Sequence, residues 1–369
     1  MEKIPFLPFL PFLDLGAQHL PLGDDLRAAA ARVLASERFI LGPEVAAFER
    51  EMAGKLGVAE VVGVSSGTDA LTALLMAAGV GAGDEVVTTP YSFFATVESI
   101  VRLGARPIFA DIEPETMNLD AAVAATRVGS RTKAVLVVHL FGRAASTGPL
   151  RAACSVAGIP LLEDAAQAIG ASEVGAGWGA ALSFFPSKNL GGFGDGGAVA
   201  TNDAALAAKV RALRNHGATK KLEHEIVGGN FRLDELQAAL LRVKLPHLSR
   251  WTAERRRLAA LYRERLAGLP IGLPPPDEGC VWNQFVIRVP AARRDPLRRH
   301  LEEHGIASAV YYAIPLHLQP ALAFLGHRPG EFPNAERAAN ESLALPIFPG
   351  LTDADLSRVA DALGDFFLR

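Results

Sequence analysis

The most informative stretch of this chain is Ser183-Phe184-Phe185-Pro186-Ser187-Lys188-Asn189-Leu190-Gly191-Gly192. Partial desolvation by the flanking apolar residues lowers the pKa of a lysine and makes its amine a nucleophile toward carbonyls. Ser183 and the glycines can seat a phosphate and let the backbone approach it closely. Lys188 is therefore a candidate Schiff-base lysine. The alternative is a lysine that merely snorkels from an apolar edge.

A second element lies upstream of the lysine, where the apolar run 159–162 leads into Glu163 and Asp164. This pattern predicts a buried parallel strand with a carboxylate at its carboxyl end, where open α/β sheets place ligand chemistry. Asp164 can keep a pyridine nitrogen protonated, which makes the ring an electron sink. The alternative for Asp164 is a helix N-cap. An N-cap needs no matching lysine, so Asp164 and Lys188 together predict a pyridoxal 5′-phosphate site.

With these residues in view, the chain resembles the sugar aminotransferases of the DegT/DnrJ/EryC1/StrS family, which have the type I fold of pyridoxal-phosphate enzymes. The resemblance runs nearly end to end. Besides the two runs above, it rests on the ordered motifs Phe39-Ile40-Leu41-Gly42-Pro43-Glu44, Ser65-Ser66-Gly67-Thr68-Asp69-Ala70-Leu71, Thr89-Pro90-Tyr91-Ser92-Phe93-Phe94-Ala95-Thr96, Val138-His139-Leu140-Phe141-Gly142 and Gly229-Asn230-Phe231-Arg232-Leu233-Asp234-Glu235-Leu236-Gln237.

We therefore expect an α/β fold with a mainly parallel sheet flanked by helices. Alternating strand-like and helix-like segments support it, with strands expected at 61–64, 86–88, 107–109 and 134–138. The large cofactor-binding domain is expected at 15–248, after an N-terminal arm at 1–14. A smaller C-terminal α/β domain is expected at 249–369, with a strand at 284–289 and a helix at 296–304. The arm carries a proline at every third position, and we interpret it as an extended segment that docks on a partner subunit.

Composition narrows the class of protein further. The chain has 369 residues, half of them hydrophobic, which is ample for a large core. A net charge of −3 gives no basic excess for binding nucleic acid. The arm is too short to span a bilayer, so no membrane association is expected. Cys154 and Cys280 lack CxxC partners, so we expect neither a disulfide scaffold nor a metal site, and a cytoplasmic location.

A phosphate site is predicted at Gly67 and Thr68, where a helix starts after a strand and its free N–H groups favour an anion. An ordinary strand-to-helix turn is the alternative. The resemblance implies that both residues contact the cofactor phosphate, with Ser183 as a further contact. It also implies that Asn230 reaches the cofactor from the neighbouring subunit, so that a homodimer shares its active sites.

Two further cofactor contacts follow from the resemblance. Phe93 matches the aromatic residue that stacks on the pyridine ring, and such a flat ring suits offset stacking. Its alternative is an ordinary core phenylalanine. Gln167 matches the family's Gln or His beside the cofactor's phenolic oxygen, and its alternative is a solvent-facing amide.

Arg232 is the candidate for substrate recognition, because its guanidinium suits carboxylate or phosphate groups. The alternative is an ion pair with Asp234 or Glu235 at a helix start.

Tyr311, Tyr312 and His317 are also substrate-binding candidates. The run Tyr311-Tyr312-Ala313 stands where many relatives carry His-Tyr-Pro before the Pro-Leu-His that ends at His317. This departure weakens any direct transfer of the family's sugar contacts to this loop.

The resemblance implies a pyridoxal-phosphate aminotransferase that moves an amino group from an amino acid, with glutamate expected, to a nucleotide-linked 3-keto or 4-keto deoxyhexose. Lys188 would act as Schiff-base lysine and as general base and acid, and Asp164 would hold the pyridinium proton. Two motifs, at 92–96 and 230–237, resemble those of C-3 transaminases more than those of C-4 transaminases and favour C-3 amination weakly. One alternative is a sugar C-3 dehydratase, which carries histidine in place of the lysine. Another is a non-catalytic regulator that keeps the fold.

Overall fold

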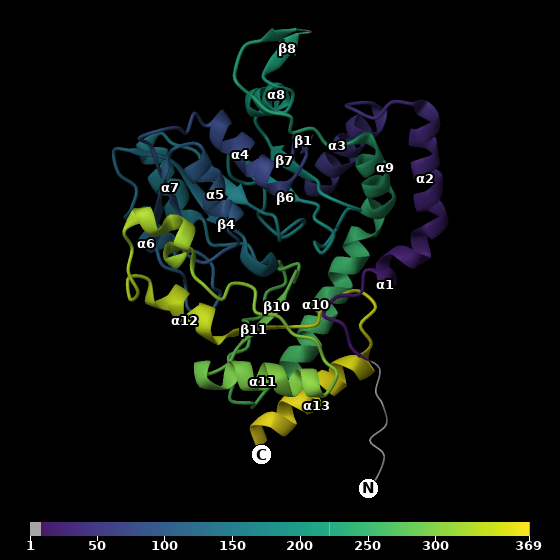
Figure 1. Ribbon diagram of the computed structural model, residues 1–369, viewed down its shortest axis with the longest axis vertical. Helices are drawn as coiled ribbons and strands as arrows, with labels where there is room; N and C mark the ends of the chain where they lie inside the picture. Colours follow the sequence, from purple (N-terminus) through teal and green to yellow (C-terminus); the bar gives the residue numbers. More distant parts are fainter. Residues whose placement is uncertain (1–8, 221, 369) are drawn as a thin grey trace.

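The computed structural model describes residues 9–220 and 222–368, and its centre is a seven-stranded sheet (Figure 1). The strand order is β1-β7-β6-β5-β4-β2-β3. Strand β7 pairs antiparallel with β1 and β6, and the other pairings are parallel, as expected. The strands are Glu60–Val64 (β1), Glu85–Thr88 (β2), Arg106–Phe109 (β3), Thr132–Val138 (β4), Leu161–Asp164 (β5), Gly179–Ser183 (β6) and Gly197–Thr201 (β7).

Helices cover both faces of this sheet, because successive side chains of a strand point to opposite sides. In β1, Val61 packs in the hydrophobic cluster of α3 (Pro43–Leu56). The next residue, Val62, packs with α4 (Gly67–Ala77) and α8 (Ala204–Leu213) on the other face. The sheet is therefore buried between two helical layers, and only its strand ends are free to carry chemistry.

The remaining helices follow the expected alternation, with one boundary corrected. The helix expected at 296–304 begins earlier, at Ala291, because the carbonyl of Pro290 accepts the N–H groups of Arg293 (2.7 Å) and Arg294 (3.2 Å) and starts the first turn there. The helices not yet named are Gly16–His19 (α1), Gly23–Ser36 (α2), Ala95–Arg102 (α5), Ala121–Ala125 (α6), Gly148–Ala157 (α7), Glu235–Lys244 (α9), Leu248–Arg265 (α10), Ala291–Glu303 (α11), Pro333–Glu341 (α12) and Asp353–Leu368 (α13).

A second hydrophobic core lies below the sheet in Figure 1, where α10, α11 and α13 surround a two-stranded antiparallel sheet. Its strands are Phe285–Arg288 (β10) and Ser342–Leu345 (β11). Tyr262 and Phe285 stack at its centre, with ring centroids 4.9 Å apart. Helices α9 and α10 lead from the upper core to the lower one. The domain boundary at 248 stays a prediction, and the separate lower core supports it.

The end of the N-terminal arm contacts its own chain. The N–H of Leu10 donates to the carbonyl of Gly305 (2.8 Å), and the carbonyl of Leu10 accepts the N–H of Ala307 (3.0 Å). Leu10 is buried in the lower core. At Leu10 the arm therefore docks on its own C-terminal unit, while residues 1–8 lie outside the described residues, and the expected docking on a partner subunit stays a prediction.

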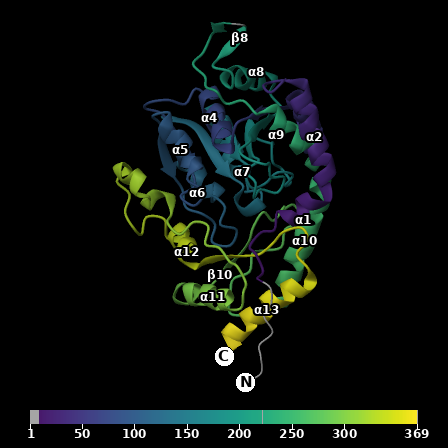
Figure 2. The same ribbon diagram turned by 45° about the vertical axis from the view of Figure 1, so that its right-hand side comes forward.

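A small hairpin of Ala218–Lys220 (β8) and Glu223–His224 (β9) projects from the body beyond α8 in both ribbon views (Figures 1 and 2). Its tip carries Leu222, which is almost fully exposed. Within the described part of the chain, no helix combines the length and the apolar character needed to cross a bilayer.

Candidate active site

A cavity of about 500 Å³ opens at the carboxyl ends of β4, β5 and β6. This is the edge at which open α/β sheets bind ligands. Among the sequence-predicted residues, nine line the cavity: Gly67, Thr68, Phe93, Asp164, Gln167, Ser183, Lys188, Tyr311 and Tyr312.

Lys188 lies on the loop that joins β6 to β7. The loop closes on itself, because Gly192 donates its N–H to the carbonyl of Phe184 (2.6 Å) and Lys188 donates its own to Phe185 (2.8 Å). Gly191 has a φ of +57°, and a Cβ there would lie 3.0 Å from the carbonyl oxygen of Lys188. Burial lowers the pKa of Lys188 to about 8, and the charge of Asp164 opposes this shift only in part. About a tenth of the amine is therefore neutral and nucleophilic at pH 7, far more than for a lysine with an ordinary pKa.

Asp164 ends β5 and is buried. Its Oδ2 accepts the hydroxyl proton of Thr96 (2.8 Å), and its Oδ1 accepts the N–H of Ala166 (3.2 Å). Burial raises the pKa of Asp164, and these hydrogen bonds and the charge of Lys188 offset only part of that rise. A cationic donor in the cavity would therefore stabilise the ionised form of this carboxylate. No helix starts at Asp164, so the N-cap alternative is wrong.

A buried pair beneath the cavity fixes the end of β5. His139 accepts the N–H of Ala145 at Nδ1 (3.0 Å), so its Nε2 carries the proton that it donates to Glu163 (3.1 Å). Glu163 also accepts the N–H groups of Gly175 and Gly177. Burial alone would raise the pKa of Glu163, but the hydrogen bonds outweigh it and hold the pKa below its usual range. Neither His139 nor Glu163 is among the site residues predicted from the sequence.

The predicted phosphate end of the cavity is formed by the start of α4 and the end of β6. The side chain of Ser66 caps α4 by accepting the N–H of Asp69 (3.0 Å), which leaves the first-turn N–H groups of Gly67 and Thr68 without an intrahelical acceptor. A Cβ on Gly67 would lie 2.8 Å from the Cβ of Ser183. Glycine is therefore required for Ser183 to approach the helix start, and the three residues together fit an anion.

Phe93 and Gln167 occupy the wall of the cavity. Phe93 is 60% exposed, so the core alternative is wrong, and its ring face is available for stacking. Gln167 is buried, so the solvent-facing alternative is wrong as well. Its Oε1 accepts the N–H of Phe141 (2.6 Å), and its Nε2 donates to the hydroxyl of Tyr312 (2.8 Å). The second Nε2 proton of Gln167 stays available to an acceptor in the cavity.

Asn230 and Arg232 do not line this cavity. Arg232 lines a neighbouring cavity, also of about 500 Å³, and donates to the side-chain oxygen of Asn215 (2.8 Å). Asn230 is exposed and forms a backbone bridge to Asn215. The carboxylate of Glu235 is engaged elsewhere, since it accepts N–H groups at the start of α3.

His317 belongs to the lining of neither cavity. It is buried, with Nε2 3.2 Å from Glu336 and its ring packed edge-on against Phe332 (4.7 Å between centroids). Its predicted role as a substrate contact gains no support from this position.

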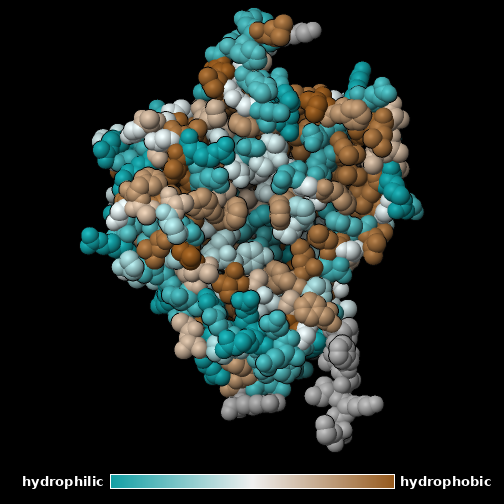
Figure 3. Space-filling model, in the orientation of Figure 1, coloured by the Kyte–Doolittle hydropathy of each residue, from teal (hydrophilic) through white to brown (hydrophobic). Residues whose placement is uncertain are grey.

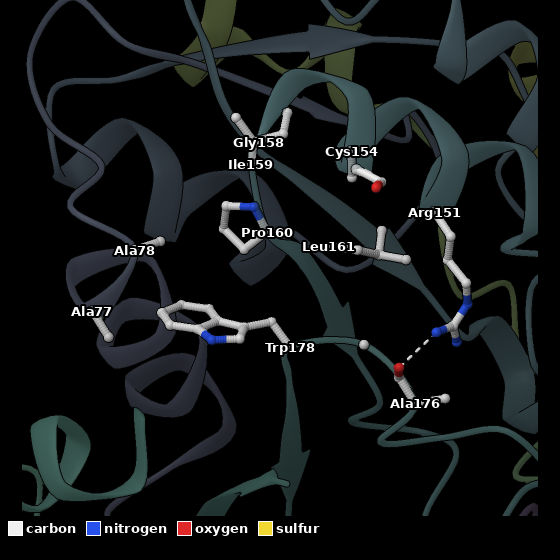
Figure 4. A pocket seen from close by; sticks show the side chains of 12 residues that line it. Ala77, Ala78, Arg151, Cys154, Gly158, Ile159, Pro160, Leu161, Ala176 and Trp178 are labelled. Atoms are coloured by element: carbon white, nitrogen blue, oxygen red, sulfur yellow. Dashed lines mark hydrogen bonds between the residues drawn. The ribbon is translucent and has the colours of Figure 1, made fainter. Parts of the chain in front are cut away.

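Another cavity lies at the opposite, amino-terminal edge of β5 and β6 (Figure 4). Trp178 and Pro160 form its apolar wall, and Arg151 donates to the carbonyl of Ala176 (2.6 Å) at its rim. It contains none of the predicted site residues. Within the described residues, no cluster of three or more His, Cys, Asp or Glu side chains is arranged to hold a metal ion.

A lysine of lowered pKa and a buried carboxylate line one cavity, with an exposed aromatic ring at its wall and the first turn of a helix at its end. Together with the seven-stranded sheet, they define a pyridoxal-phosphate enzyme of the type I fold.

Comparisons with known proteins make the assignment specific. The model of the DegT/DnrJ/EryC1/StrS aminotransferase family matches residues 22–364. The chain is 45% identical to the "pleiotropic regulatory protein" of Geobacillus stearothermophilus, over 96% of this chain and 98% of that protein. It is 44% identical to the dTDP-3-amino-3,4,6-trideoxy-alpha-D-glucose transaminase of Streptomyces venezuelae, over 99% and 96%.

Among solved structures, S. venezuelae DesV in complex with a ketimine intermediate superposes with a TM-score of 0.95 at 43% identity, covering 98% of this chain and 100% of that one. The chain belongs to the DegT/DnrJ/EryC1/StrS aminotransferase family. The predicted fold, enzyme class and cofactor are thereby confirmed.

Reduction of the purified holoenzyme with borohydride should fix the cofactor on Lys188, because that amine faces the cavity with a lowered pKa. Peptide mapping by mass spectrometry identifies the labelled lysine. Lys188→Ala should abolish the label, whereas Lys209→Ala, which alters a lysine on α8, should retain it. A label on any other lysine would contradict the assignment.

Asp164→Asn should slow each half-reaction by about 100-fold or more while the cofactor stays bound, because the amide keeps the shape and loses the charge. Stopped-flow absorbance measures this rate. Asp203→Asn is the matched control, since Asp203 is a true N-cap that accepts the N–H groups of Ala205 and Leu206 at the start of α8. Near-normal rates in Asp164→Asn would refute the electron-sink role.

Proposed function

We propose that this enzyme transfers an amino group from an amino acid, with glutamate as donor, to the keto carbon of a nucleotide-linked deoxyhexose. The observation that carries the proposal is the convergence of Lys188 and Asp164 in one cavity beside the exposed ring of Phe93. The relative from S. venezuelae is named for a dTDP-linked sugar aminated at C-3, which supports a nucleotide 3-ketosugar as substrate. A 4-ketosugar is the alternative within the same chemistry.

Pyridoxal phosphate, when bound, supplies the electron sink. The first-turn N–H groups at Gly67 and Thr68, with Ser183, hold its phosphate. Phe93 presents a flat face for its ring, and Gln167 offers an N–H from the wall. The carboxylate of Asp164 keeps a proton on the ring nitrogen. Held by these residues, the cofactor would lie in the cavity that the amine of Lys188 also lines.

The amine of Lys188 performs the proton transfers. As a neutral base its Nζ removes the proton from the carbon that bears the donor nitrogen. In the second half of the reaction, as an ammonium, it gives a proton to the former keto carbon that receives the amino group. A pKa near 8 allows both states near neutral pH. Donor and acceptor use one cavity in turn, so ping-pong kinetics are expected.

Two alternatives are less favoured. A sugar C-3 dehydratase would carry histidine where this chain has Lys188. A regulator without catalysis accords with the name of the G. stearothermophilus relative, but such a role requires neither a reactive lysine nor the carboxylate opposite it. We place the reaction in the cytoplasm, because both cysteines are free and buried.

Purified enzyme should aminate a nucleotide 3-ketosugar with glutamate at least about tenfold more efficiently than the matching 4-ketosugar, a discrimination within the reach of one well-placed contact. Product formation is followed by mass spectrometry with dTDP-linked and UDP-linked sugars in parallel. Preference for the 4-keto series would reverse the assignment of the carbon. If the cofactor is bound at Lys188 but none of the nucleotide sugars is aminated, the result favours the non-catalytic regulator.

We further propose a homodimer with shared active sites. Asn230 is exposed, and Arg232 lines a cavity next to the one that holds Lys188. Beside them, Ile40 forms a backbone bridge to Asp234 and is 51% exposed. Figure 3 shows hydrophobic colour on the side of the molecule where α2 and α9 lie. An exposed apolar surface beside a half-formed polar cavity suits a second copy of the chain.

Mixing inactive Lys188→Ala chains with inactive chains altered at both Asn230 and Arg232 should partly restore activity. A mixed dimer, with one chain of each variant, then contains one intact composite site. In that site Lys188 comes from one chain, and Asn230 and Arg232 come from the other. Subunit exchange is verified by native mass spectrometry, and each variant alone is the control. If exchange occurs and activity does not return, each site is built within a single chain.

A further inference from the structure

Lys244, at the end of α9, is a lysine with no exposed surface. Its Nζ donates to the carbonyl of Gly191 (2.5 Å) and to Nε2 of His19 (2.8 Å). It also lies over the rings of Phe193 and Trp251, 5.4 and 5.8 Å from their centroids. These partners are uncharged acceptors and aromatic faces, so Lys244 is buried without the carboxylate that a buried lysine usually has.

The surroundings of this amine are adapted to it. Burial, with a smaller effect of Lys244, lowers the pKa of His19 to about 4, which leaves its Nε2 free to accept near neutral pH. Burial lowers the pKa of Lys244 to about 7. An apolar side chain would fill the same space without the desolvation cost, so packing alone does not explain a lysine here.

Two of the four partners of Lys244, Gly191 and Phe193, belong to the loop that carries Lys188. A second residue of α9 contacts the same loop: Gln237 accepts the N–H of Phe193 (2.9 Å) and donates to the carbonyl of Asp195 (3.3 Å). Gln237 and Lys244 are two helical turns apart and so lie on one face of α9. One rigid face of a helix therefore holds the loop through side chains at both its ends.

The carbonyl that Lys244 holds is coupled closely to Lys188. Gly191 takes a left-handed conformation, and a Cβ added there would lie 3.0 Å from the carbonyl oxygen of Lys188, so the backbones of the two residues lie close together. On the other side, the side chain of Asn189 donates to the carbonyl of Val281 (3.0 Å) and accepts from Asn283 (2.7 Å). Because these bonds hold the side chain of Asn189 in place, we expect a displacement of the Gly191 backbone to shift the backbone of Lys188 as well.

We propose that Lys244 is a positioning residue for Lys188: by holding the carbonyl of Gly191 it fixes the loop that aims the reactive amine into the cavity. This inference rests on the proposed role of Lys188. Lys244 itself touches neither cofactor nor substrate and acts only through the loop.

The test compares Lys244→Met with Lys209→Met. Lys209 also donates its ammonium to a backbone carbonyl, that of Ala77 (2.8 Å), but far from the loop. The readout is the rate at which pyridoxal phosphate bonds to Lys188 in cofactor-free protein, followed by absorbance. Lys244→Met should slow this rate about tenfold, because the loop loses the hydrogen bond that holds the carbonyl of Gly191, and Lys209→Met should leave it unchanged.

Hydrogen exchange provides an independent measurement. Amides of residues 186–194 should exchange faster in Lys244→Met, while those of β4 and β5 keep the wild-type rate. Lys244→Gln retains an N–H donor and should recover most of the bonding rate. Should Lys244→Met fail to fold, Lys244→Leu replaces it, because leucine also removes the amine that holds the carbonyl of Gly191.

The outcomes separate the two assignments. If borohydride labels another lysine in the wild-type enzyme, the role of Lys188 is wrong. If the wild type is labelled at Lys188 while folded Lys244→Met, or Lys244→Leu in its place, bonds the cofactor and exchanges its loop amides as the wild type does, the positioning role alone is overturned.

Discussion

The structure depends on holding two opposite charges, those of Asp164 and Lys188, partly out of water in one cavity. Each charge is unfavourable there alone, since burial raises the pKa of the acid and lowers that of the amine. The strand order satisfies this constraint. Because β6 and β7 are antiparallel neighbours, the loop between them returns at the carboxyl end of β6, beside the end of β5. Lys188 is thereby delivered to the edge of the sheet where Asp164 stands.

Much of this arrangement could be predicted from the sequence. The strand that ends in Asp164 is a local apolar run, and the helix start at Gly67 has a local turn signature, so both were found from short-range patterns. The donors to Asp164 and Glu163 could not be found in this way. Thr96 lies 68 residues from Asp164, and His139 lies 24 residues from Glu163, so only the folded sheet brings them together.

Single-chain geometry also limits what could be predicted about the substrate. Arg232 and His317 were selected by residue type and motif, yet the fold sends one to a neighbouring cavity and the other into the packing around Phe332. Tyr312 was expected at the substrate, and its hydroxyl is engaged with Gln167. Its side chain thus fixes the amide that faces the cofactor space. Side-chain roles in this loop follow from hydrogen-bond partners that no motif encodes.

The docking of Leu10 on Ile306 has a consequence for the order of events during synthesis. Leu10 precedes most of its companions in the lower core by a long stretch of chain, since they extend to Leu363. The upper sheet, complete by residue 201, can form while the chain is still growing. The lower core cannot close until Leu363 has been synthesised, so Leu10 must remain unpaired while the chain between them is made.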